Sequence, residues 1–290
     1  MGVVQQFNAT IWCWAEMFRA MKRRVAMAPF LLYAALQLLL LLLVLGFTLP
    51  LLRSFMPALM VWRFGEQALH YPNNLLVMRG ALGEVDLLMS VFLGAFVTAS
   101  AAHLFASFYG GTLRRASDGY AAGRANYLPA LAVALIVAVI SQLVVRVPMA
   151  FWGGLADTSP LRFRMLRMVL IGAVVVVQTL FIYGIPAIMI DGKRVGAAIS
   201  GSLSLAFRNP ITSLILVGVP AAVELIPAWI MRNSSVIIYR FAPEFIVAGM
   251  IVWIVAILFI NYATIGAATR FYLHGTANEA PTPKRRGGNR

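Results

Sequence analysis

The sequence has little of the material from which metal and redox centres are built. A chain of 290 residues carries a single cysteine, Cys13, so it cannot form a disulfide framework within itself. Its three histidines, His70, His103 and His274, are spread along the chain without the close spacing of metal ligands. We therefore expect no bound metal and no cofactor.

Motifs of several enzyme classes are also missing. The chain contains no "GxxxxGK[ST]" phosphate loop and no "HExxH", so it offers no site for an ATPase or a zinc protease. Trp62-Arg63 resembles a feature of rhomboid proteases, but the catalytic serine and histidine have no counterpart in the fourth and sixth apolar segments. Asp118 and Asp191 stand singly in Asp-Gly turns. These absences predict that the protein is not an enzyme. A lipid-modifying enzyme stays open, and would require polar residues converging on a cavity.

Charged residues are scarce and mostly basic. They make up 12% of the chain, and the net charge is +14. On a soluble domain this balance would indicate nucleic-acid binding, but here the lysines and arginines lie mostly between long apolar runs. Membrane topology and anionic lipid headgroups explain them, so we expect no nucleic-acid partner.

Apolar residues are abundant, at 61% of the chain, with a mean hydropathy of +0.84. A bilayer core of about 30 Å needs roughly 20 apolar residues in a helix. Six segments satisfy this length, which predicts an all-α polytopic membrane protein with six transmembrane helices. The segments are Phe30–Leu49, Leu87–Tyr109, Leu128–Val147, Met168–Ile190, Ile211–Ile230 and Phe245–Ala268.

The basic residues also predict the orientation. With both termini in the cytoplasm, every lysine and most arginines fall in inner segments, as the positive-inside rule requires. We expect a multi-pass protein of the bacterial inner membrane. The first apolar run is too long for a signal peptide and is interpreted as a retained anchor.

Prolines and tyrosines recur in the same order along the chain. One proline stands at the start of each odd-numbered span, a second stands near its end, and a tyrosine closes each even-numbered span. This order predicts three tandem hairpins, at about 1–112, 113–192 and 193–273, in one domain spanning 1–273. The polar remainder, 274–290, is expected to be a disordered basic cytoplasmic tail.

Four segments lie outside the predicted spans and have a pattern of their own. Near the N-terminus, Val4, Phe7, Ile11, Trp14 and Phe18 share one face of an amphipathic helix. Residues 195–206 show a similar pattern, whereas the segment 114–127 is glycine-rich and too short to predict a helix. These interfacial helices serve either lipid contact or the joining of spans. The outer loop, 51–86, is apolar and is interpreted as containing a helix on the outer leaflet, which either plugs the outer face or docks a partner.

A few polar side chains fall within the predicted spans. Glu224 and Arg146 lie at similar depths on the fifth and third spans, so they are expected to pair, with Gln142 nearby. Glu224 could instead line a cavity as a transport residue, or snorkel to the surface. His103 is expected to tie helices together. The arginines that open the fourth span either bind lipid phosphate or snorkel at the interface: Arg162, Arg164 and Arg167.

The stretch "AIMIDGKRVGAAISGSLSLAFRNPITSLILVGV", 187–219, resembles bacterial six-span membrane proteins of unassigned function. These are the YciC-like proteins and the membrane domain of some glycerophosphodiester phosphodiesterases. In the latter the reaction belongs to an attached barrel, so the resemblance implies a membrane module without a reaction. We expect a non-catalytic, lipid-interacting or accessory subunit of a membrane or envelope assembly. The alternative is a small-solute or ion transporter that uses Glu224 and Arg146.

Overall fold

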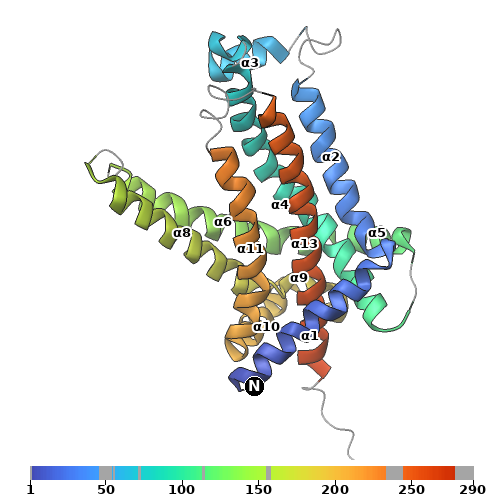
Figure 1. Ribbon diagram of the computed structural model, residues 1–290. Coiled ribbons are helices and arrows are strands. Elements are labelled where there is room, and N and C mark those ends of the chain that lie inside the picture. Colours follow the sequence, from blue (N-terminus) through green and yellow to red (C-terminus); the bar gives the residue numbers. More distant parts are fainter. Residues whose placement is uncertain are drawn as a thin grey trace, which may run out of the picture.

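The computed structural model describes residues 2–45, 54, 56–70, 73–112, 115–154, 158–232 and 244–277, and the regular structure in these ranges is entirely helical (Figure 1). The all-α prediction is therefore confirmed. In chain order the elements are α1 (Val3–Met21), η1 (Arg24–Met27), α2 (Ala28–Leu45), α3 (Met56–Phe64), η2 (Glu66–Leu69), α4 (Asn73–Tyr109), α5 (Ala116–Ala125), α6 (Tyr127–Trp152), α8 (Pro160–Phe181), α9 (Gly184–Asp191), α10 (Val195–Arg208), α11 (Pro210–Arg232) and α13 (Phe245–Ala277).

Five stretches of the described helices are long and apolar enough to cross a membrane, which is compatible with a multi-pass protein. They are Arg24–Leu43, Val85–Tyr109, Tyr127–Trp152, Pro160–Asp191 and Phe245–Gly275. The predicted fifth span passes the same test only as a pair, α10 with α11, bent by 101°. The bend falls at Asn209, whose backbone leaves the helical region because a proline follows it.

The helices α2, α4, α11 and α13 run side by side, and α1 crosses one end of this bundle (Figure 1). Helix α4 packs against α2, α5, α6, α9 and α13, so it is central. Small residues recur at every fourth position along it and allow neighbouring helices to approach closely: Gly94, Thr98, Ala102 and Ala106. The pairs α2–α4, α6–α8 and α11–α13 are in contact. The α6–α8 hairpin projects from the bundle at a large angle (Figure 1).

Three boundaries differ from the prediction. Helix α4 begins at Asn73, so the second half of the supposed outer loop is helix continuous with the span. Residues 116–125 form α5. Gly119 and Gly123 let this helix lie close against α4, because a Cβ atom at Gly119 would come within 2.6 Å of Leu104 and one at Gly123 within 2.1 Å of Ser100. Helix α13 extends to Ala277, so the start of the predicted tail is helical. The rest of that tail lies outside the described residues.

Helix α1 has a polar side turned inward and an apolar side turned outward. Gln6, Thr10 and Cys13 are buried against the bundle. The Oε1 atom of Gln6 accepts hydrogen bonds from the backbone N–H groups of Ile211, at 3.0 Å, and Thr212, at 3.4 Å. It thereby satisfies donors in the first turn of α11, which have no partner within their own helix. The outward side carries exposed Val4, Phe7, Ile11 and Phe18.

A candidate ligand cleft between the helices

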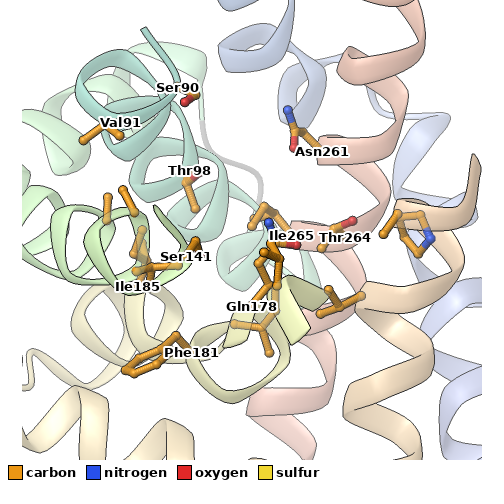
Figure 2. Close-up of a pocket in the computed structure, with 18 of the residues that line it drawn as sticks. Ser90, Val91, Thr98, Ser141, Gln178, Phe181, Ile185, Asn261, Thr264 and Ile265 are labelled. Atoms are coloured by element: carbon orange, nitrogen blue, oxygen red, sulfur yellow. The ribbon is translucent and has the colours of Figure 1, made fainter. Parts of the chain in front are cut away.

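A cleft of about 480 Å³ lies where α4, α6, α8, α9, α11 and α13 meet (Figure 2). Most of its lining is apolar, from valine, isoleucine, alanine and phenylalanine side chains. Figure 2 shows Ser141, Gln178, Asn261 and Thr264 around the same space. The polar side chains of the lining come from five helices: Ser90 and Thr98, Ser141 and Gln142, Gln178, Glu224, and Asn261 and Thr264.

Helical periodicity brings these residues to the cleft. On α11 the lining residues are Val217, Pro220, Ala221 and Glu224, which recur at three- and four-residue spacing and so share one helix face. On α6 the lining pairs 133–134, 137–138 and 141–142 recur every four residues. The chain therefore presents Glu224 and Gln142 to one space although they lie more than 80 positions apart in the sequence.

The predicted ion pair between Glu224 and Arg146 is not formed. Arg146 is exposed, and its Nε atom donates to Oε1 of Gln142, one turn earlier on the same helix, at 3.1 Å. Glu224 is partly buried and, among the described residues, makes neither a hydrogen bond nor an ion pair. Similar depth was not enough to bring the two charges together, because Arg146 lies one helical turn beyond Gln142, the last residue of α6 that lines the cleft.

The acidic neighbour of Glu224 is Asp86 on α4, whose carboxylate lies close enough to repel it. Gln37 of α2 donates from Nε2 to Oδ1 of Asp86 at 2.5 Å, and the hydroxyl of Tyr33 is a second hydrogen-bond partner. Asp86 was not predicted as a site residue, because it stands at the end of the predicted outer loop. The available signal was the uninterrupted helix-compatible stretch from Asn73 onward.

The other predicted site residues lie away from the cleft. His103 on α4 is partly buried, its backbone carbonyl accepts a bond from Ser107 Oγ at 2.9 Å, and it does not line the cleft. Arg162, Arg164 and Arg167 are exposed in the first turns of α8. The guanidinium of Arg167 lies 6.0 Å from the ring centre of Phe163.

Two polar networks hold the helix ends opposite α3. At the break between α8 and α9, Ser202 Oγ donates to the carbonyl of Leu180 at 2.7 Å and accepts from the N–H of Tyr183 at 3.2 Å. The Tyr183 hydroxyl bonds Ser213 of α11 at 2.8 Å. After α9, Lys193 donates to Tyr272 of α13 at 2.9 Å and pairs with Asp191, also at 2.9 Å.

Those contacts favour the charged form of Lys193. The hydrogen bond with Tyr272, followed by that with Asp191, raises the pKa of Lys193 to about 12. Cys13 is buried in α1, and desolvation raises the pKa of its thiol to about 12. Within the described ranges, no three His, Cys, Asp or Glu side chains are grouped to hold a metal ion, so we assign no metal centre.

Comparisons with known proteins do not assign the chain to a family. No family model, curated protein or solved structure matches the chain. The resemblance to YciC-like proteins and to the phosphodiesterase membrane domain therefore stays a prediction, carried by the residues from Ala187 to Val219.

Proposed function

We propose that the chain is a non-catalytic, six-span membrane protein that binds a membrane amphiphile in the cleft described above. The observation that carries the proposal is the cleft's mixed lining. A largely apolar wall suits acyl chains, and the side chains of Gln142, Gln178, Asn261 and Glu224 suit a polar headgroup. Its volume of about 480 Å³ falls in the range of roughly 300 to 1,000 Å³ usual for small-molecule pockets.

The α6–α8 hairpin supports a lateral route from the bilayer to this cleft. Its outward side carries exposed Leu135, Val139 and Leu143 on α6 and Val169 and Val176 on α8. Water would make such a surface costly, whereas acyl chains cover it without a penalty. The hairpin therefore stands in lipid, with one side facing the cleft, and an amphiphile reaches the cleft without crossing water.

The orientation belongs to the same proposal. Both termini lie in the cytoplasm of a bacterial cell, and α1 and α10 lie along the inner leaflet. The exposed apolar side of α1 enters that leaflet, and Arg19, Lys22, Arg23 and Arg24 near its end meet anionic headgroups. On the outer side, Arg162, Arg164 and Arg167 meet lipid phosphates.

An accessory role within a membrane or envelope assembly follows from the outer surface. Helix α3 presents Trp62, whose exposed fraction is 80%, together with exposed Leu59. Exposed tryptophan is enriched at protein interfaces and at membrane interfaces. We propose that the 51–86 segment docks a protein partner there, and that the inner interfacial helices offer a second contact surface.

A blocked cleft tests the proposal. Ala138→Trp places an indole in the cleft, whereas Val139→Trp, the adjacent position on the exposed side of α6, places it in lipid. Both variants are purified in mild detergent, and retained lipid is measured by native mass spectrometry. We expect the wild type and Val139→Trp to retain one amphiphile and Ala138→Trp to lose it. Equal lipid retention by all three proteins would refute binding in the cleft.

Transport of a small solute or ion is the second candidate, and two observations favour it. Glu224 is an ionisable side chain in a cleft between candidate spans, and α10 and α11 meet at a 101° break where a helix pair can bend. Flux in proteoliposomes distinguishes the two functions. Loss of flux in Glu224→Gln and in Arg146→Gln, with normal folding, would establish transport.

A further inference from the structure

We propose that the cleft recognises its ligand through a protonated amine held by Glu224. This inference rests on the proposed function, because it names the headgroup chemistry of the amphiphile that the cleft binds. It would apply equally to an aminophospholipid and to a free lipophilic amine, which share a primary ammonium group on an apolar body.

The charge of the lining is the first argument. Of the described side chains that line the cleft, Glu224 alone is ionisable, so no lysine or arginine there offsets its charge. Asp86 adds a second negative charge within reach of Glu224. Arg146, which the sequence predicted as the counter-ion of Glu224, is exposed and bonded to Gln142. The cleft therefore attracts a cation and repels an anionic headgroup.

The energetics of a membrane interior are the second argument. An ionised carboxylate in an apolar environment is costly unless a partner compensates it, and partly buried Glu224 has none within the described chain. An ammonium group bound against the carboxylate removes that cost with a charge-assisted hydrogen bond. The ammonium group of the ligand thus supplies the cation of an ion pair for which the cleft supplies the carboxylate.

Hydrogen-bond capacity is the third argument. A primary ammonium group carries three N–H donors and no acceptor. The polar lining offers acceptors for these donors: the carboxylate oxygens of Glu224, the amide oxygens of Gln178 and Asn261, and the hydroxyl of Thr264. A quaternary ammonium has the charge but no donors, so it should bind less well than a primary one.

The experiment compares headgroups on the same acyl chains. Wild-type protein in mild detergent is exposed to equimolar phosphatidylethanolamine, phosphatidylcholine and phosphatidylglycerol, and the retained lipid is counted by native mass spectrometry. We expect the ethanolamine lipid to be retained roughly tenfold over the glycerol lipid, with the choline lipid between them. Glu224→Gln should bring the three close to equality, whereas Glu66→Gln, an exposed acid outside the cleft, should change nothing.

A second arm identifies the source of the amine. Dodecylamine and dodecanol are titrated separately against the purified protein, and its thermal unfolding is followed. Stabilisation by dodecylamine alone, with no preference among the phospholipids, would assign a free amine. Stabilisation together with selective retention of the ethanolamine lipid would assign the lipid.

The outcomes separate this inference from the function on which it rests. Lipid retained in the cleft without headgroup preference, together with equal effects of amine and alcohol, would overturn the amine inference and leave the proposed function standing. Preference for the glycerol lipid would do the same. If Ala138→Trp retains as much amphiphile as the wild type, both the amine inference and the proposed function are overturned. The wild-type headgroup comparison needs no variant, so the test stands even where Glu224→Gln fails to fold.

Discussion

Replacing Gly266 with alanine tests the packing of α1 and α4 onto α13. Gly266 is buried in α13 at the point where Met17 of α1 and Phe105 of α4 meet it. A Cβ atom there would lie 2.8 Å from Phe105 Cζ and 2.9 Å from Met17 Cγ. Real Cβ contacts are wider than this, so a neighbour must move.

The neighbours have little room to move. The ring of Phe105 is fully buried, and it lies between Tyr109 and Tyr262, with ring centroids 5.9 and 5.1 Å away. Overpacking of this kind costs about 1–3 kcal/mol. Alanine also gains up to about 1 kcal/mol of helix propensity over glycine. A matched variant, Gly172→Ala in α8, gains the same propensity in open space, because nothing lies within 4 Å of its Cβ.

The difference between the two variants cancels helix propensity and isolates the packing cost. We expect Gly266→Ala to be less stable than Gly172→Ala by about 1–3 kcal/mol. The free energy of unfolding is measured in mixed micelles titrated with SDS and followed by circular dichroism. Equal stability of the two variants would refute the contact among α1, α4 and α13.

Three further outcomes are expected. Cys13 is buried, and its pKa is raised from 9.0 to about 12, so at pH 8 a maleimide should label the folded protein about a thousandfold more slowly than the SDS-unfolded protein. Tyr272→Phe should cost about 1 kcal/mol of stability, measured by thermal unfolding. Because the folded pKa of Lys193 is raised above 10.5, that cost should stay constant from pH 6 to pH 9 and shrink as the pH rises from 10.5 towards 12. Neutralising Arg162, Arg164 and Arg167 to glutamine should weaken contact with anionic lipid by about 1 kcal/mol per arginine, measured by quenching with brominated phosphatidylglycerol.

The sequence predicted the helices better than their contacts. Length and hydropathy located the spans because each follows from the residues of one segment alone. The turn-like sequence Arg208-Asn209-Pro210 indicated the break between α10 and α11, since a proline disfavours the helical backbone conformation of the residue before it. Helix α5 was missed because glycine lowers helix propensity, whereas in the fold Gly119 and Gly123 are required for close approach to α4.

In the cleft, too, the sequence predicted single residues better than the contacts between them. Glu224 and Gln142 were predicted as intramembrane polar candidates, and both line the cleft. Their partners were not predictable, because the depth of a residue along one helix does not determine which residues of the neighbouring helices lie opposite it. Arg146 satisfied the depth argument and lies outside the lining, whereas Asp86, outside the predicted spans, lies within reach of Glu224.

The two walls of the cleft are held very differently, and this bears on how a ligand enters. The α11 wall is fixed in its first turn by Gln6 of α1, which bonds Ile211 and Thr212, and by the bond between the next residue, Ser213, and Tyr183. The α6 wall buries only Ala130 and Val133, both near its start. Since unburied helix adds little packing energy to a fixed geometry, we expect the width of the cleft to vary with the position of the α6–α8 hairpin. In the proposed complex the headgroup then lies against Glu224 on the α11 wall, and the apolar part of the ligand lies against the α6 wall, which lipid would cover.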